Sequence, residues 1–197
     1  MINEKIHYRL PLKLINSYIW AGLNEPAKAI LPVLGVYANK DGKAWPGVKL
    51  IAELAGYKDL RRIRLGMNDL IKNKLIIRKK QGRHYNYFLI ELAIWKKGRS
   101  FFPIYKTMVL SNFWAKLTPS EKSLYIVLGV KAKINDPEAL DSEFHAIGNI
   151  NKIKKYIEWA GISRRSLYNA YYGVNHKHLI EYWEDEDPFK YAIYTHP

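Results

Sequence analysis

Four polar side chains between residues 61 and 68 could bind a patterned ligand through paired hydrogen bonds. They are Arg61, Arg62, Arg64 and Asn68. A guanidinium offers a planar fork of donors and a carboxamide offers a donor beside an acceptor. Arginine therefore matches the major-groove edge of guanine, and asparagine that of adenine. We expect some of the arginines to contact phosphates instead, which positions a protein without reading sequence. An ordinary solvated helix face is the alternative.

An amphipathic helix is expected to position these side chains. Its predicted apolar face consists of Leu60, Ile63, Met67, Leu70 and Ile71, which recur at helical spacing. Asp59 is a suitable N-cap for this helix. A shorter apolar helix over residues 48–55 precedes it and ends at Gly56. Two short helices joined by a tight turn, the second with a basic outer face, predict a helix-turn-helix.

A β-hairpin is predicted directly after this helix. Residues 75–80 and 84–92 are its expected strands, and residues 81–83 form a three-residue turn. The tip is cationic and carries Arg78, Lys79, Lys80 and Arg83. A hairpin in this position is the wing of a winged helix, and a cationic tip suits contact with phosphates.

Residues 10–92 resemble the winged helix-turn-helix domain of phage- and plasmid-borne replication and regulatory proteins. Three stretches carry the resemblance: ANKDGKAWP at 38–46, LIAELAG at 50–56, and the DLRR helix that ends in KNKLI at 72–76. Gly47 follows Trp45-Pro46 where that family usually has serine, and one extra residue lies between Gly56 and Ile63. The resemblance implies a DNA-binding fold.

Positive charge is concentrated in the first half of the chain. The 197 residues carry a formal net charge of +14. Residues 1–100 hold 20 Lys/Arg and 7 Asp/Glu, whereas residues 101–197 hold 12 and 11. A basic region gains free energy on a polyanion by releasing counterions, so nucleic acid is the expected partner. A solubilising surface and an affinity for acidic lipid are the alternatives.

The composition is that of a folded protein, with 48% hydrophobic residues. The chain has no cysteine, which excludes disulfides and thiolate metal sites and suits a reducing compartment. No apolar run reaches the length of a membrane span, and the N-terminus lacks the apolar core of a signal peptide. We therefore expect a cytoplasmic protein without membrane contact.

Two stretches of the chain are alike. Residues 20–38 and 114–132 share Trp, Ala, Leu, Lys, Val-Leu-Gly-Val and a final Ala at a constant offset of 94. Further on, Ala55-Gly56 matches Ala160-Gly161, and Leu75-Ile76 matches Leu179-Ile180. These matches predict an internal duplication. The expected fold is α+β and mainly helical, with tandem winged helix-turn-helix domains over residues 1–97 and 101–197.

The second copy has its own candidate reading face but an unlike hairpin. Ser163 is expected to cap a helix with five exposed candidates for DNA contact: Arg164, Arg165, Ser166, Tyr168 and Asn169. The expected strands 178–183 and 189–194 are joined by an acidic run at 184–187, which phosphates would repel. We expect helix contact with DNA together with a protein partner or self-association through this domain. The acidic insertion at 134–144 favours the same interpretation.

No catalytic, metal or cofactor site is predicted. Adjacent carboxylates at a hairpin tip, such as those at 184–187, rarely converge on one ion, and His176 and His178 lack further ligands. The lysine between these histidines breaks the His-hydrophobic-His pattern that a nucleophilic Tyr171 or Tyr172 would need. A glycine-rich phosphate loop is absent from the sequence. We expect a protein that is not an enzyme.

These features favour sequence-specific binding of double-stranded DNA in a mobile element, a plasmid or phage. Replication initiation at an origin is the leading role, because tandem readers in one chain suit a site of two half-sites. Repressors usually obtain two readers by homodimerising. The alternatives are transcriptional regulation, an adaptor that recruits a protein through the second domain, and a nicking enzyme, which would require metal-dependent cleavage.

Overall fold

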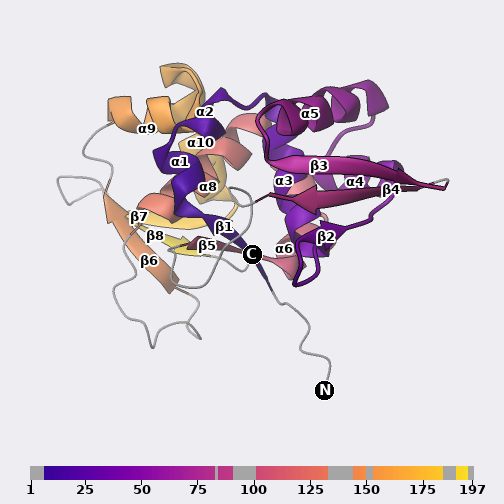
Figure 1. Ribbon diagram of the computed structural model, residues 1–197. Helices are drawn as coiled ribbons and strands as arrows, with labels where there is room; N and C mark the ends of the chain where they lie inside the picture. Colours follow the sequence, from indigo (N-terminus) through magenta and orange to yellow (C-terminus); the bar gives the residue numbers. More distant parts are fainter. Residues whose placement is uncertain are drawn as a thin grey trace.

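The chain folds into a mixture of helices and short strands. The computed structural model describes residues 7–82, 84–90, 101–132, 144–149, 153–183 and 190–194 (Figure 1). The first half contains β1 (His7–Pro11), α1 (Leu12–Asn16), α2 (Ile19–Gly22), α3 (Glu25–Tyr37), β2 (Lys43–Ala44), α4 (Val48–Ala55), α5 (Leu60–Lys72), β3 (Ile76–Gln81) and β4 (His84–Leu89). The second half contains β5 (Phe101–Tyr105), α6 (Lys106–Leu110), α7 (Phe113–Lys116), α8 (Pro119–Lys131), β6 (Phe144–Asn149), α9 (Ile153–Ala160), α10 (Arg164–His176), β7 (Ile180–Trp183) and β8 (Lys190–Tyr194).

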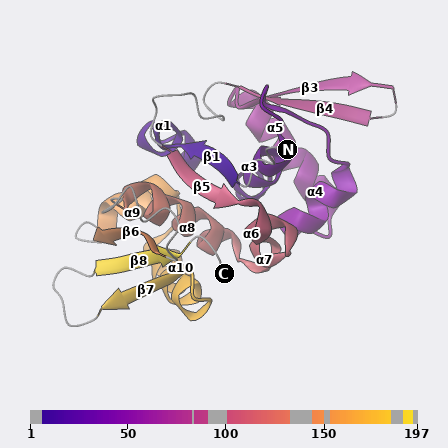
Figure 2. The same cartoon turned by 90° about the horizontal axis from the view of Figure 1, so that it is seen from below.

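The described strands form three antiparallel sheets. One sheet has the order β2-β4-β3, another has the order β6-β8-β7, and the remaining one pairs β1 with β5. Residues 101–194 thus show the same order of elements, and the same strand order within a sheet, as residues 7–89. The β3–β4 and β7–β8 hairpins lie at opposite ends of the molecule, with the β1–β5 pair between them (Figure 2).

Two long helices, α3 and α8, occupy the centre. The Asn24 side chain caps α3 by accepting a hydrogen bond from the N–H of Ala27 at 2.9 Å. At α8 a capping box forms, in which Thr118 and Glu121 each accept from the other's backbone N–H. Such caps satisfy donors that the first turn of a helix leaves unpaired. Both helices are buried along nearly their whole length, because each packs against elements on several sides.

One continuous hydrophobic core runs through both halves. Trp20 and Trp114, the tryptophans that begin the two similar stretches, are fully buried. Each indole N–H donates to a carbonyl of the other half: Trp20 to Ser123 at 3.4 Å, and Trp114 to Ala29 at 2.9 Å. The halves therefore share their interior. The predicted domain boundary at residues 97–100 lies outside the described residues.

The first hairpin differs from its prediction in two respects. Gln81 pairs with His84, so its turn has two residues and not the expected three. Gly82 has a positive φ of 58°, which the favoured two-residue hairpin turns require. In addition, the sheet has a third strand that was not predicted, because β2 precedes α4 and pairs with β4.

The second hairpin is described only in its strands, β7 and β8. The acidic run at 184–187 and most of the insertion at 134–144 lie outside the described residues. Across the described ranges, no helix is long and apolar enough to cross a membrane.

Candidate nucleic-acid interface

The pair α4–α5 forms a compact helix-turn-helix in the first half. α4 ends at Gly56, whose φ of 81° is the left-handed conformation that glycine adopts without strain. α5 then begins at Asp59, whose carboxylate accepts from the N–H of Arg61 at 2.8 Å. The turn and the cap together fix where α5 starts and therefore which side chains its first turns present.

Close packing against α3 sets the orientation of α5. Ile63, Met67 and Leu70 are buried, as expected. Gly66 is buried too, and a Cβ there would lie 2.7 Å from the carbonyl carbon of Pro26. Ile71, predicted to belong to the buried face, is 36% exposed. The absence of a side chain at residue 66 lets α5 approach the backbone of α3, so the helix cannot rotate freely about its axis.

Three of the four predicted reading residues in α5 point outward together. Arg61, Arg64 and Asn68 are all exposed and lie at the spacing of one helical face. Their side chains have no hydrogen-bond or ion-pair partner among the residues that the structure describes. We call these three residues the α5 stripe. Its donors and acceptors are available to a ligand.

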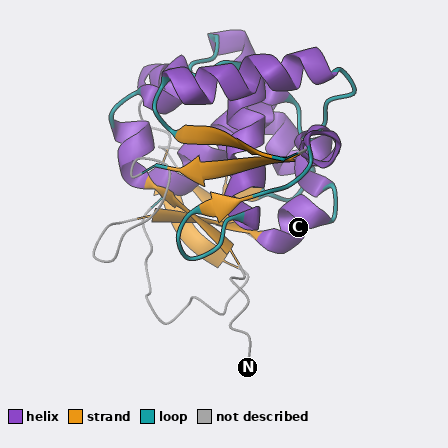
Figure 3. Ribbon diagram, turned by 45° about the vertical axis from the view of Figure 1, so that its right-hand side comes forward, coloured by secondary structure: helices purple, strands orange, loops and turns teal. Residues whose placement is uncertain are grey.

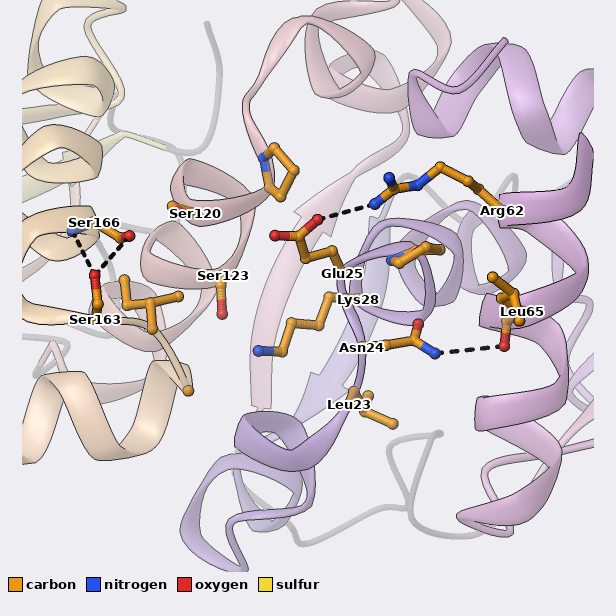
Figure 4. A pocket seen from close by; sticks show the side chains of 14 residues that line it. Leu23, Asn24, Glu25, Lys28, Arg62, Leu65, Ser120, Ser123, Ser163 and Ser166 are labelled. Atoms are coloured by element: carbon orange, nitrogen blue, oxygen red, sulfur yellow. Dashed lines mark hydrogen bonds and ion pairs between the residues drawn. The ribbon is translucent and has the colours of Figure 1, made fainter. Parts of the chain in front are cut away.

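Arg62 is placed differently. Its guanidinium donates to the Glu25 carboxylate at 3.1 Å and lies 5.3 Å from the centre of the Tyr57 ring (Figure 4). Arg62 thus faces the start of α3, away from the α5 stripe. The pair is exposed, so its contribution to stability is small, but it gives the guanidinium a partner within the protein.

The β3–β4 hairpin carries the predicted cations away from the body of the protein (Figure 1). Arg78, Lys79 and Lys80 are all exposed. Arg78 lies 4.9 Å from the centre of the Tyr85 ring, and Lys79 lies 5.5 Å from that of Phe88. These cation–π contacts hold the positive groups along the strand. Arg83, the fourth predicted contact, lies outside the described residues.

An exposed tryptophan next to the helix-turn-helix was not among the predicted contacts. Trp45 is 58% exposed and lies just before α4. The Lys43 ammonium lies 6.0 Å from its ring centre and 5.9 Å from that of Phe88. The signal was present in the sequence as an aromatic residue in a polar, turn-rich segment.

The pair α9–α10 repeats this local geometry in the second half. Gly161 has a φ of 62°, and the Ser163 hydroxyl accepts from the N–H of Ser166 at 3.1 Å. Of the predicted contacts, Arg164, Arg165, Tyr168 and Asn169 are exposed, whereas Ser166 is half-buried. Tyr172, which was not predicted as a contact, is 61% exposed. Tyr171 is buried against the core.

A pocket of about 670 Å³ lies between the α4–α5 pair and the α9–α10 pair. The first turns of α3, α5, α8 and α10 line it, with Arg62 on one side and Ser163 and Ser166 on the other (Figure 4). Lys28 lies at its floor and donates to the carbonyls of Ala160 at 2.7 Å and Ala21 at 3.4 Å. Burial lowers the pKa of Lys28 to about 8.

Lys122 occupies the matching position in α8. It donates to the carbonyl of Leu117, and burial lowers its pKa to about 8 as well. Both lysines bind carbonyls at the ends of neighbouring helices, so their role is to join helices. Within the described ranges, no three His, Asp or Glu side chains come close enough together to hold a metal ion.

Comparison with known proteins supports this description. Residues 21–76 match a family model described as a helix-turn-helix domain. The matched segment extends from α2 to the first residue of β3 and so contains α4 and α5. No curated protein and no solved structure matches the chain. The predicted helix-turn-helix is thus confirmed over these residues, and its presence indicates that the protein binds DNA.

Proposed function

We propose that the protein binds double-stranded DNA sequence-specifically, with α5 in the major groove. The observation that carries this proposal is the α5 stripe: two arginines and an asparagine on one exposed helical face, without partners among the described residues. Arg61 and Arg64 match guanine, and Asn68 matches adenine. The stripe lies on the second helix of a helix-turn-helix, the element that usually enters the groove.

The β3–β4 hairpin holds the DNA backbone in this proposal. Lys79 and Lys80 supply charge near the tip, and phosphates accept hydrogen bonds from such groups whatever the base sequence. Trp45 and Lys43 extend the same surface beside α4. The basic first half then contributes affinity that depends on salt, and the α5 stripe contributes the sequence preference.

We also propose that the second half is a diverged second winged helix-turn-helix. Its support is the matching order of elements and strands, together with the equivalent caps at Asp59 and Ser163. In this reading α10 contacts DNA through Arg164, Arg165, Tyr168 and Asn169. The acidic sequence at 184–187 opposes backbone contact by the second hairpin.

For the biological output we propose replication initiation on a mobile element, in preference to transcriptional regulation. The support is the family resemblance of residues 10–92 and the repetition of the α4–α5 arrangement by α9 and α10 in the same chain. A plasmid that carries the selected site as its origin should replicate only when the protein is supplied. A site that instead overlaps a promoter, with repression and no effect on replication, would favour regulation.

An adaptor role is the second candidate, and the exposed Tyr172 with the acidic run favours it. In that case the second half would bind a protein while the first half holds DNA. Neither role needs catalysis. Incubation of supercoiled plasmid with the protein and Mg²⁺ or Mn²⁺ should leave the plasmid intact, and nicked circles would contradict this proposal.

Selection from a random duplex pool at about physiological salt tests the proposed function, because high salt suppresses binding that depends on charge alone. Enrichment of a defined sequence is the expected result, and the α5 variant Arg61→Ala with Arg64→Ala should lose part of it. Uniform recovery of all sequences would show an unspecific basic anchor and would remove sequence-specific binding from consideration.

A further inference from the structure

The two halves of the chain make reciprocal contacts. The indole of Trp20 donates to the carbonyl of Ser123, and the indole of Trp114 donates to that of Ala29. The offset of 94 that relates Trp20 to Trp114 also relates Ala29 to Ser123, so each contact is the image of the other. Contacts that exchange in this way are the property of an interface built on a twofold axis.

The β1–β5 pair locates that axis. Arg9 pairs with Pro103, which is its own equivalent at the offset of 94. To either side, Tyr8 pairs with Ile104 and Leu10 pairs with Phe102, and these pairs are again images of one another. A two-stranded ribbon with this register has its symmetry centre between Arg9 and Pro103.

The two helix-turn-helix turns show the same reciprocity. A Cβ on Gly161 would lie 2.1 Å from the carbonyl oxygen of Ala21, and a Cβ on Gly56 would lie 2.3 Å from that of Ala115. Each turn thus packs on the short helix of the opposite half, α2 or α7. Figure 2 shows the resulting arrangement, in which α4 and α9 lie on opposite sides of the central helices.

The pocket between the helix-turn-helix units lies on the same axis. Equivalent residues line it from both halves: Glu25 with Pro119 in the central helices, and Arg62 with Ser166 in α5 and α10. The N-terminal turns of α5 and α10 therefore flank the axis together.

We propose that the chain is an internal pseudo-dimer that reads one DNA site as two inverted, unlike half-sites. This inference rests on the proposed DNA binding and specifies its target. Readers related by a shift along the DNA need direct repeats. Readers related by a twofold axis need inverted ones, because protein symmetry is mirrored in the site.

The half-sites are unlike because the two helices present different side chains at equivalent positions. At the offset of 104 that relates α5 to α10, Arg64 corresponds to Tyr168 and Asn68 corresponds to Tyr172. The α5 half-site should contain guanine and adenine at the bases that α5 contacts. The α10 half-site should favour bases that offer apolar surface, such as the thymine methyl group.

Cleavage of DNA from single attached iron chelates tests this arrangement. The sequence contains no cysteine, so one introduced cysteine gives one attachment point. Lys72→Cys and His176→Cys label the outer ends of α5 and α10, at equivalent exposed positions. Leu65→Cys and Ser166→Cys label the side of each helix that faces the pocket. Each variant is bound to the duplex selected with the full-length chain.

The inner pair should cleave near the centre of the footprint, and the outer pair near its two opposite ends. If Lys72→Cys and His176→Cys instead cleave on the same side of their respective half-sites, the inverted arrangement is wrong. Cleavage from Lys72→Cys but not from His176→Cys would show that only α5 reads DNA. If no variant gives a footprint, the proposed DNA binding itself fails, which is a separate result.

Reversal of the α10 half of the selected duplex gives an independent readout. The inverted arrangement predicts that affinity falls by roughly tenfold or more, because several base contacts become mismatched at once. Unchanged affinity would overturn the proposal. Reversal of flanking DNA outside the footprint is the matched control and should have no effect.

Discussion

α5 and α10 occupy equivalent places in the two halves but present different chemistry to solvent. α5 carries the stripe Arg61, Arg64 and Asn68, whereas α10 carries Arg165, Tyr168 and Tyr172 at the same positions. The buried positions of both helices are small or apolar, with Tyr171 of α10 as the exception. The shared core therefore constrains the inner face of each helix, whereas the outer face is free to change with the ligand.

The backbone N–H of the N-cap residue of each central helix is satisfied by a different residue in the two halves. In the first half, Asp69 of α5 accepts from the N–H of Asn24 at 2.7 Å. In the second half, Glu121 of α8 itself accepts from the N–H of Thr118 at 2.7 Å. Gly173 replaces the aspartate, and a Cβ there would lie 2.0 Å from the Glu121 carboxylate. Glu121 can therefore occupy this position only because residue 173 has no side chain.

Removal of the α5 stripe should have the largest effect on binding. Arg61→Ala with Arg64→Ala is expected to cost about 2–6 kcal/mol on the selected duplex, because each bidentate base contact contributes about 1–3 kcal/mol. Fluorescence anisotropy with a labelled duplex measures this loss. Arg62→Ala is the matched control and should cost far less, since Arg62 is paired with Glu25. A larger loss for Arg62→Ala would contradict our assignment of the stripe.

Substitution at the helix-turn-helix glycines tests whether the halves are structurally equivalent. Gly56→Ala and Gly161→Ala should each lower the free energy of unfolding by about 2–4 kcal/mol, because both combine a positive φ with a carbonyl in the place of the new Cβ. Denaturant unfolding followed by circular dichroism measures this. Gly22→Ala is the control, since no atom lies within 4 Å of its Cβ position. Losses that differ widely between residues 56 and 161 would break the equivalence.

Loss of hairpin charge should weaken binding to all sequences alike. We expect Lys79→Ala with Lys80→Ala to reduce affinity by about tenfold and to lower the slope of log affinity against log salt by about 2, one for each phosphate contact. Binding to the selected duplex and to a scrambled duplex should fall equally. A loss confined to the selected duplex would mean that these lysines read bases.

Removal of the α10 tyrosines should have a smaller, localised effect. Tyr168→Ala with Tyr172→Ala is expected to reduce affinity about threefold to tenfold, through lost apolar contact. A repeated selection should show relaxed preference in one half of the site only. Tyr172→Phe retains the ring and should bind as the parent does. A relaxed base preference in the α5 half-site would refute the assignment of one half-site to each helix.

The smallest expected effect is a dependence of stability on pH that both halves share. The pKa of Lys28 and that of Lys122 are lowered to about 8 by burial, so the folded protein releases these protons at lower pH than the unfolded chain. The free energy of unfolding should therefore rise as pH increases from 8 towards 10. Near pH 10 it should fall again, because burial raises the pKa of Tyr8 and Tyr125 above that of exposed tyrosine.

Urea unfolding at each pH measures this profile, and Lys28→Met should remove part of the rise while leaving the fall. A profile that declines steadily from pH 8 would show that both lysines are unperturbed.

Sequence patterns predicted those features that depend on local chemistry. The caps at Asp59 and Ser163, the apolar spacing of Ile63, Met67 and Leu70, and the cationic hairpin follow from neighbouring residues alone. The ion pair of Arg62 with Glu25 joins residues 37 positions apart, so helical periodicity could not separate Arg62 from the α5 stripe. The β1–β5 pair joins still more distant segments, and neither strand is strongly patterned.

The β1–β5 ribbon has a consequence for how the protein would respond to its own copy number. Because the ribbon and the shared core fix α5 and α10 within one chain, the entropy cost of bringing the two helices together arises during folding and not at the DNA. A homodimeric reader dissociates on dilution, so its occupancy of a site falls with the square of monomer concentration. Occupancy by this chain should instead follow the first power, which lets a cell with few molecules fill a site in direct proportion to their number.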